Sequence, residues 1–347
     1  MHDTWLRVPF ATGEHADFHY RWLRHNCDLD RHPTTGERTV CSSDLPDVVS
    51  ARRAWVSGDT LVLEWAHDGR QSAYDLGWLR RHAYALGREA TTIASDLGPV
   101  QFTAPSSAEA ARLALGRVRA HGLAVLRRGD TGRAPEDDTE PLIEAFERQG
   151  LRVIGTHFGR IEDLRTDNTT NANTDQLGYT DAGIELHTDQ PFLDTPPRYQ
   201  LLQGIRRADE GGESFLADAR SAWRHLATID ARAATLLATV PVRFHRQQKH
   251  FERIVDAPLI HVGASDDDFQ VRFSYFTLAP HRLPFAQLDE YYRAHDRFAR
   301  LVRDPAHQYR FTLNPGDWVL YDNHRMLHGR TGFRGPRWVR GVYLDRA

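Results

Sequence analysis

The alternation of apolar and polar positions predicts a chain built mainly from short strands, with helices in a few places. Trp55–Trp65 reads WVSGDTLVLEW, two β-rich runs around a Gly-Asp turn, which predicts a hairpin. A short helix is predicted at YDLGWLRRHAYAL, and the Gly, Pro, Ser and Thr of Thr92–Ser107 are typical of a linker. We therefore expect a small β-rich domain over residues 1–95 and a second domain over residues 105–347.

The second domain has a characteristic order of patterns. Helical periodicity occurs in AEAARLALGRVRAHG, EPLIEAFERQG and LDEYYRAHDRFARLVRD. Strands are predicted at LAVLRR, RYQLLQGI, ESFLAD, VPVRFH, FQVRFSYF, YRFTL, DWVLYD and RWVRGVYLD. Many short strands with a few grouped helices indicate a mainly β (α+β) fold, a double-sheet barrel or jelly roll flanked by helices.

The composition excludes several classes of protein but does not indicate a function. The chain has 40% hydrophobic and 26% charged residues and a formal net charge of -3, which gives no electrostatic reason to expect nucleic acid or a membrane surface. No apolar run reaches the roughly 18 residues of a spanning helix, and the N-terminus lacks a secretory signal pattern. Two cysteines, Cys27 and Cys41, exclude a disulfide framework. We expect a cytoplasmic protein with a small-molecule partner.

The candidate chemistry begins at IELHTDQPF, where His187 and Asp189 stand two residues apart. In an extended chain such positions share a face, so both side chains can converge on one ion. The bare pattern is weak, because His15-Ala16-Asp17 repeats it. A second element, NPGDWVLYDNHRMLHGRTGF, runs from a Gly-Asp turn through a strand to His328. Two histidines and one carboxylate leave three positions of an octahedral ion open, the arrangement of non-haem iron(II) oxygenases.

Several alternatives stay open at this point. His187 and His328 are also compatible with ordinary polar residues at strand ends, although the linked set disfavours that reading. His324 is a rival third ligand, but its surroundings, Asp322–Arg325, are typical of a turn. A zinc hydrolase with the same ligands needs a general base, and no HExxH pattern is present. A non-catalytic jelly roll that binds a small ligand or senses metal is the remaining alternative.

A basic strand follows the second histidine. RWVRGVYLD places Arg337 and Tyr343 on one face and Arg340 on the other. A 2-oxoglutarate cosubstrate chelates iron through its keto and C1 carboxylate groups, so its C5 carboxylate needs a partner. A guanidinium offers bidentate hydrogen bonds to a carboxylate, which makes Arg337 the candidate and leaves Arg340 as a solvated charge. Ser214, shortly after a Gly-Gly turn, is a candidate to assist with its hydroxyl, and an ordinary strand-end serine is the alternative.

Three blocks of sequence carry a family resemblance. LHTDQPFLDTPPRYQLLQGIRRADEGGESFLAD, and YDNHRMLHGRTGF with RWVRGVYLD, resemble the γ-butyrobetaine hydroxylase branch of the taurine dioxygenase-like superfamily. WLRHNCDLDRHPTTGER resembles the small N-terminal domain that only this branch carries. The resemblance implies a double-stranded β-helix, use of dioxygen, and a homodimer. It also implies Fe(II) at His187, Asp189 and His328, and 2-oxoglutarate at Arg337 with Ser214 in the family's hydroxyl position.

The same resemblance implies a reaction. An unactivated carbon of a small amino-acid-like or quaternary-ammonium substrate is hydroxylated, and 2-oxoglutarate is converted to succinate and CO₂. Related halogenases replace the carboxylate ligand by a small residue, so Asp189 favours hydroxylation. Tyr179, Tyr343 and Phe158 match aromatic positions that surround a trimethylammonium group by cation–π contacts.

Two departures from the family pattern concern the substrate. The expected cage tryptophan falls near Glu162, in the polar stretch RIEDLRTDNTTNANTD. Ser274 and Tyr275 stand where the family has asparagines that hold the substrate carboxylate. The aromatic residues are equally compatible with a core role, so the resemblance leaves the substrate open.

A third departure concerns zinc in the N-terminal domain. The family holds zinc there with three cysteines and a histidine. Here Cys27 stands alone, Leu29 occupies the second cysteine's position, and His82 matches the histidine. Because one cysteine and one histidine cannot close a tetrahedral site, even with Cys41 as a distant candidate, we predict no zinc.

Overall fold

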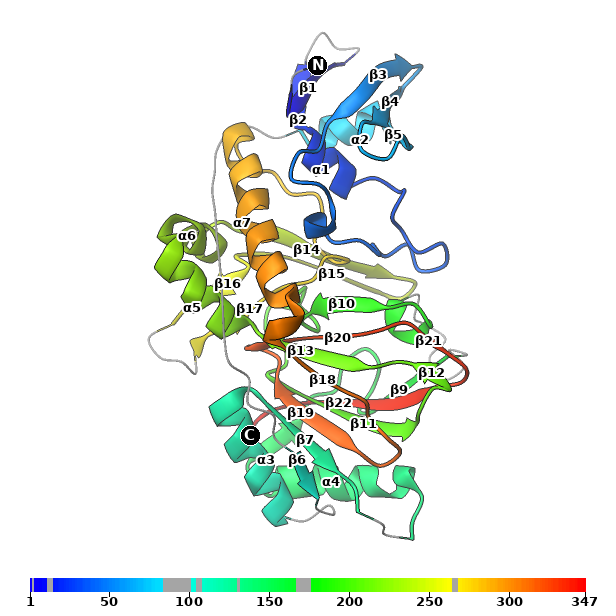
Figure 1. Ribbon diagram of the computed structural model, residues 1–347, viewed down its shortest axis with the longest axis vertical. Helices are drawn as coiled ribbons and strands as arrows, with labels where there is room; N and C mark the ends of the chain where they lie inside the picture. The colour runs from blue at the N-terminus through cyan, green and yellow to red at the C-terminus, as the bar shows by residue number, and fades with distance from the viewer. Residues whose placement is uncertain are drawn as a thin grey trace.

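Two facing β-sheets form the centre of the molecule (Figure 1). The computed structural model describes residues 1, 3–10, 15–83, 101–103, 108–129, 132–166, 176–263 and 268–347. One sheet has the order β10-β20-β13-β18, with bounds Ile184–His187, Met326–Arg330, Ser214–Asp218 and Gln308–Phe311. The other has the order β6-β7-β19-β11-β22-β8, with bounds Gln101–Thr103, Leu123–Arg127, Trp318–Asp322, Tyr199–Arg206, Trp338–Arg346 and Leu151–Val153. β9 (Glu162–Arg165) also pairs with β22, and the whole confirms the predicted jelly roll.

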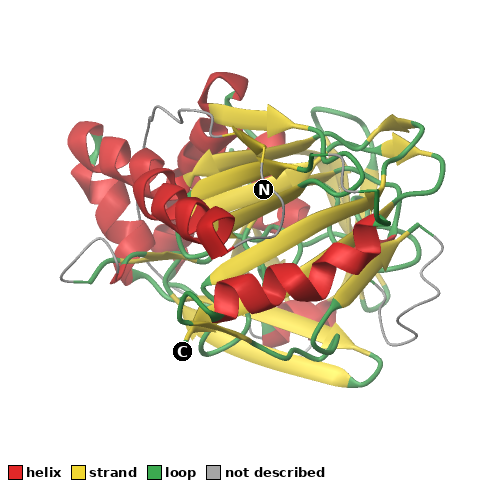
Figure 2. Cartoon of the chain, turned by 90° about the horizontal axis from the view of Figure 1, so that it is seen from below, coloured by secondary structure: helices red, strands yellow, loops and turns green. Residues whose placement is uncertain are grey.

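The run WVLY in β19 shows how the sheets are covered. Side chains alternate along a strand, and here both faces are apolar because both are buried. Trp318 and Leu320 pack against α3 (Ala108–His121) and α4 (Thr139–Glu147), whereas Val319 and Tyr321 enter the core between the sheets. Figure 2 shows the helices flanking the stacked strands. No helix in the described part of the chain is long and apolar enough to cross a membrane.

The N-terminal region is a set of small sheets and short helices. Its elements are β1 (Trp5–Pro9), β2 (His15–His19), α1 (Tyr20–His25), β3 (Ala51–Ser57), β4 (Thr60–Trp65), β5 (Gln71–Asp75) and α2 (Leu76–Arg81). β3 and β4 pair around Gly58-Asp59, which confirms the predicted hairpin. The predicted helix after it forms only as α2, and its last predicted residues, 84–86, lie outside the described ranges.

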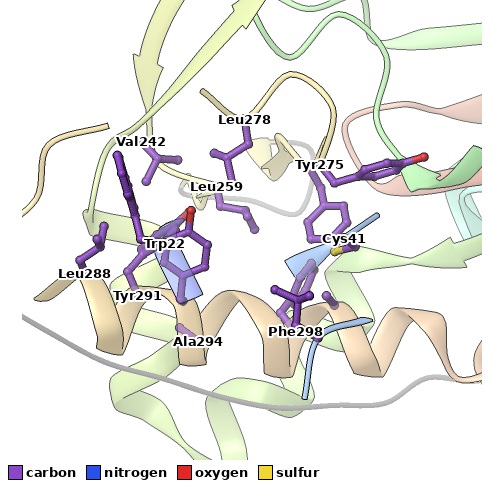
Figure 3. Close-up of a cluster of buried hydrophobic side chains, with 14 of the residues drawn as sticks. Trp22, Cys41, Val242, Leu259, Tyr275, Leu278, Leu288, Tyr291, Ala294 and Phe298 are labelled. Carbon is purple, nitrogen blue, oxygen red and sulfur yellow. The ribbon is translucent and has the colours of Figure 1, made fainter. Parts of the chain in front are cut away.

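A shared hydrophobic core joins this region to the rest of the molecule. Three further helices, α5 (Ala219–Ile229), α6 (Ala231–Thr239) and α7 (Phe285–Arg303), gather beside the smaller sheet (Figure 1). In Figure 3, Trp22 and Cys41 of the N-terminal region lie with Tyr291 and Phe298 of α7, and all four are almost fully buried. The N-terminal region is therefore packed on the rest of the molecule through α7.

The remaining strands are short or form hairpins. They are β12 (Glu210–Gly211), β14 (Val242–Gln248), β15 (Phe251–Ala257), β16 (Ile260–His261), β17 (Gln270–Val271) and β21 (Phe333–Arg334). β14 and β15 form a hairpin, and β12 pairs with β21.

Two predictions of local structure were wrong. The predicted linker contains β6, which pairs in parallel with β7, so those three residues belong to the larger sheet; the other linker residues lie outside the described ranges. The predicted strand FQVRFSYF is a strand only over β17. Its apolar pattern reflects burial rather than sheet pairing, because Arg272 bonds to three loop carbonyl oxygens and the backbone of Phe273 pairs with Thr188.

The residues that match the family's zinc ligands have other partners or are buried in the core. The buried Arg24 guanidinium lies 3.2 Å from the sulfur of Cys27 and forms ion pairs with Asp30 and Asp68. A side-chain cation thus already occupies the space beside Cys27. Cys41 lies in the shared core, where burial raises the pKa of its thiol to about 11 and so opposes the thiolate that zinc needs. His82 binds the carbonyl oxygen of Trp78.

Candidate active site

The two histidines of the candidate metal site are neighbours across paired strands. His187 ends β10 and lies directly opposite His328 of the antiparallel strand β20. Partners in such a pair present their side chains on the same face. Gly329 lets the strands approach, because a Cβ there would lie 2.7 Å from the Ile184 carbonyl oxygen and would overlap the Phe215 ring. Pairing of β10 with β20 thus joins two candidate ligands that are far apart in the sequence.

Asp189 completes the group just after β10 ends. Its Oδ1 lies 3.4 Å from His187 Nε2 and 3.8 Å from His328 Nε2. The possible ligand atoms of these three residues all lie within 4.8 Å of one another, and within the described ranges this is the only such group of three. The distances suit a single divalent ion held on one side, and the ligand types suit iron(II).

Neighbouring residues fix the orientation of Asp189. Asn323 accepts a hydrogen bond from the Asp189 backbone N–H and donates one to its carbonyl oxygen. The Tyr343 hydroxyl donates to Oδ2 at 2.8 Å, which leaves Oδ1 toward the histidines. Gln190, next in the chain, has φ of 59°, so the backbone turns sharply after Asp189. The predicted cage residue Tyr343 therefore also supports the candidate ligand.

The protonation states favour metal binding. The Nδ1 of His187 lies 2.8 Å from the Glu185 carbonyl oxygen, so it is the protonated nitrogen and Nε2 is free to coordinate. Burial, followed by the nearby His187, lowers the pKa of His328 to about 3, which keeps that imidazole neutral. Burial raises the pKa of Asp189, but the two histidines and Tyr343 outweigh it and the net shift is downward.

His187, Asp189 and His328 line a cavity, and the buried guanidinium groups of Arg330 and Arg337 line it as well. The Arg337 side chain contacts the Phe333 ring and forms no hydrogen bond or ion pair with the described residues. Burial lowers its pKa to about 10. Among the described residues, Arg330 donates only to backbone carbonyl oxygens, including those of Ala182 and Thr180. Two buried cations without a carboxylate partner in these ranges favour an anionic ligand beside the candidate metal site.

The predicted residues lie at different distances from this cavity. Ser214, Phe158 and Tyr343 line it. Tyr179 lies behind it and donates a hydrogen bond to Glu162, which lines the cavity. Ser274 and Tyr275 are buried outside the lining.

Phe276, the next residue, reaches the cavity in their place. Tyr275 belongs to the shared core in Figure 3, and its hydroxyl accepts from the Glu185 backbone N–H.

Arg340 and His324 are not among the residues that line the cavity. Arg340 was expected to be solvated, but it is only 20% exposed and forms an ion pair with Asp163 on the face of β22 away from the cavity. That prediction was wrong because β9 covers this part of the strand. His324 is not a member of the triad. Its Nε2 lies 2.9 Å from the Pro196 carbonyl oxygen, as the predicted turn suggested.

Sequence reasoning missed a buried polar network at the cavity. Glu37 of the N-terminal region forms an ion pair with Arg246 of β14 and accepts from the Leu177 backbone N–H. Gln176 connects Arg246 to Glu162. Asn323 was missed as well, although it stands between the predicted turn residues Asp322 and His324. No local pattern marks Glu37, because its partners come from distant segments.

Comparison with known proteins identifies the family. The model described as "Taurine catabolism dioxygenase TauD, TfdA family" matches residues 84–343. The chain belongs to this family. It is an Fe(II)- and 2-oxoglutarate-dependent dioxygenase, as the resemblance implied, and not a non-catalytic jelly roll.

Relatives within the TauD family agree along nearly the whole chain. The γ-butyrobetaine dioxygenase of Pseudomonas sp. (strain AK-1) is 29% identical, over 98% of this chain and 91% of its own. The trimethyllysine dioxygenase of Meyerozyma guilliermondii is 25% identical, over 98% and 90%. Among solved structures, AAD-2 in complex with Mn(II) and N-oxalylglycine has a TM-score of 0.52 at 16% identity, over 74% of this chain and 97% of that one. This last likeness supports the fold.

Proposed function

We propose that His187, Asp189 and His328 hold the iron and that Arg337 binds the C5 carboxylate of 2-oxoglutarate. One observation carries this assignment. The triad and a buried guanidinium without a described partner line the same cavity. Ser214 lines it too and supplies a hydroxyl for the same carboxylate.

We further propose that the reaction hydroxylates an unactivated carbon of a small amino-acid-like or quaternary-ammonium compound. Iron, 2-oxoglutarate and dioxygen together supply the oxidant, and succinate and CO₂ are released. The chain's own residues orient the reactants. The triad occupies one side of the ion, and Tyr343 and Asn323 hold Asp189 in place.

The relatives support this substrate class by name, since they include a γ-butyrobetaine dioxygenase and trimethyllysine dioxygenases. Phe158 and Tyr343 provide aromatic surface in the cavity, with Tyr179 behind Glu162. Retention of Asp189 supports hydroxylation, because a carboxylate ligand leaves no room for a halide. A cytoplasmic location, a homodimer and the lack of nucleic-acid or membrane partners are our proposals as well; the net charge of -3 supports the last of these.

A substrate screen tests the proposed function. Betaines, amino acids and related small molecules are incubated with the protein, Fe(II) and 2-oxoglutarate. We expect at least one to stimulate succinate release and to gain the mass of one oxygen atom. Replacement of His187, Asp189 or His328 by Ala should abolish both signals while the fold is retained. Undiminished turnover in any of the three variants would overturn the ligand assignment.

A further inference from the structure

Glu162 occupies an unusual place for a carboxylate. It begins β9, is only 6% exposed, and lines the cavity that contains the metal triad. The hydroxyl of Tyr179 and the amide nitrogen of Gln176 both donate to its Oε1, at 2.9 and 3.1 Å. These donors fix the carboxyl group in one orientation at the cavity wall.

The second oxygen of Glu162 has no such partner. No hydrogen bond to Oε2 and no ion pair with the side chain is formed by any other residue in the described ranges. Burial, followed by the nearby Asp189 carboxylate, raises the pKa of Glu162 to about 8, so at neutral pH its ionised form is favoured only when a cation binds beside it. A buried carboxylate with one unmet oxygen is costly unless a bound group supplies the missing donor.

The charges around the cavity separate into two groups. Arg337 and Arg330 have no carboxylate partner in the described part of the chain, and they serve an anionic cosubstrate. On the side of Glu162, Arg246 is the nearest cation of the network, but it is neutralised by Glu37. When Glu162 is ionised, this side therefore has an excess negative charge and favours a cation.

Gln176 determines the direction of the hydrogen bonds in this network. Its amide nitrogen donates to Glu162, and its amide oxygen accepts from Arg246 at 3.1 Å. A rotated amide would lose both bonds. The donor beside Glu162 is therefore already committed to Oε1, and Gln176 cannot turn to serve Oε2.

We propose that Glu162 selects a substrate whose cationic group carries N–H donors, a primary or secondary ammonium or a guanidinium, over the corresponding trimethylammonium. A trimethylammonium group has no donor and leaves Oε2 unmet, whereas an N–H group forms a charge-assisted hydrogen bond. The hydrogen bond distinguishes two cations of equal charge. This inference rests on the proposed function, because it concerns the substrate side of the same cavity.

Binding to matched pairs of compounds tests this inference. The probes are 4-aminobutyrate with γ-butyrobetaine, lysine with N6-trimethyl-lysine, and arginine, titrated by calorimetry into protein loaded with Mn(II) and N-oxalylglycine. We expect at least one unmethylated member to bind about tenfold or more tightly than its trimethyl counterpart. Tighter binding of the trimethyl members, or no binding of any amine or of arginine, would overturn the proposal.

The variant Glu162→Gln keeps the shape and removes the charge. It should lose the preference for N–H cations and leave the affinity for N-oxalylglycine unchanged. Asp163→Asn is the matched control, since this neighbouring carboxylate points away from the cavity toward Arg340 and Trp338. The control should keep the preference. A preference that survives in Glu162→Gln counts against the role of Glu162.

Failure of this inference differs from failure of the proposed function. If the metal and N-oxalylglycine do not bind, the proposed function fails. If they bind but the protein prefers trimethylammonium compounds, the proposed function stands and the role of Glu162 is wrong.

Discussion

At the scale of single residues, the candidate ligands depend on neighbours that the family motifs do not mark. The Tyr343 hydroxyl holds one carboxylate oxygen of Asp189, and Asn323 holds the backbone on both sides of the same residue. Such outer contacts orient a ligand and hold it ready for the ion. Both contacts can be tested separately from the chemistry.

Replacement of Tyr343 by Phe should weaken Fe(II) binding by about tenfold, because the ring remains while the hydrogen bond to Asp189 is lost. The dissociation constant for Fe(II), measured anaerobically, checks this. Tyr74→Phe is the control, since it removes a buried hydroxyl that bonds to Leu23 in the N-terminal region. Equal iron affinity in the wild type and Tyr343→Phe would contradict a positioning role.

Replacement of Arg337 by Ala should raise the KM for 2-oxoglutarate by about a hundredfold, the effect of losing charge-assisted hydrogen bonds worth about 3 kcal/mol. The rate at saturating 2-oxoglutarate should change much less. Arg334→Ala is the control, because this side chain is 84% exposed and pairs with Glu210 at the surface. An unchanged KM for 2-oxoglutarate in Arg337→Ala would remove Arg337 from the assignment.

At the scale of elements, the sequence predicted the helices and strands whose hydrophobic pattern matches the faces that they bury. The β3–β4 hairpin, the long helix α7 and the strands that carry His187 and His328 all follow from alternation, helical periodicity and turn residues. FQVRFSYF has the composition of a strand, but Arg272 and Phe273 are buried by loop contacts that depend on the tertiary fold. The candidate ligands could be predicted from the sequence because each lies in or next to a recognisable strand.

The network at Glu162 could not be predicted in the same way. It joins the N-terminal region, β9, the segment before Tyr179, and β14, and no periodicity relates these elements. From the sequence, the family resemblance indicated only that the expected cage tryptophan falls near Glu162. Its partners became visible when the N-terminal region was placed against the catalytic core.

The N-terminal region offers a prediction about stability. Arg24 is 2% exposed and bridges Cys27, Asp30 and Asp68, so Arg24→Met should remove the buried cation of this cluster and lower the free energy of unfolding by about 2 kcal/mol. Denaturant unfolding measures this. Arg70→Ala should lower it by less than about 1 kcal/mol, because Arg70 pairs with the same carboxylates from an exposed position. Equal decreases in the free energy of unfolding in both variants would contradict the structural role that we assign to the buried Arg24.

Metal content tests the prediction that the N-terminal region holds no zinc. We expect the variant His187→Ala, incubated with zinc and then dialysed, to retain no tightly bound zinc, since Cys27 contacts Arg24 and Cys41 is a buried thiol. Elemental analysis measures the ratio of zinc to protein. One zinc per chain in this variant would show that the N-terminal region still binds metal.

At the scale of the whole molecule, stability depends on histidines buried where the N-terminal region meets α7. Burial lowers the pKa of His281 to about 4. The hydrogen bond to the Ala279 carbonyl oxygen opposes this shift, and the positive charge of Arg38 adds to it. An unfolded chain binds a proton near pH 6.5, so the unfolded state holds more protons between about pH 6.5 and pH 4. Stability from this residue is present above that window and is lost as the pH falls through it.

We therefore expect the free energy of unfolding to fall between pH 7 and pH 5, with a contribution of about 1–2 kcal/mol from His281. Urea unfolding at the two pH values measures the fall. His281→Gln should show a smaller fall, even if it is less stable at both values. An identical fall in the variant and the wild type would assign the pH dependence to other groups.

Two strands of the jelly roll bring His187 and His328 together with Asp189, and we propose that these three residues hold iron beside 2-oxoglutarate. The most direct test is the visible charge-transfer absorption of an Fe(II)–2-oxoglutarate complex, recorded anaerobically on the wild type and on His328→Ala. We expect this absorption in the wild type and its loss in a folded His328→Ala variant. The same absorption in both proteins would contradict the proposal.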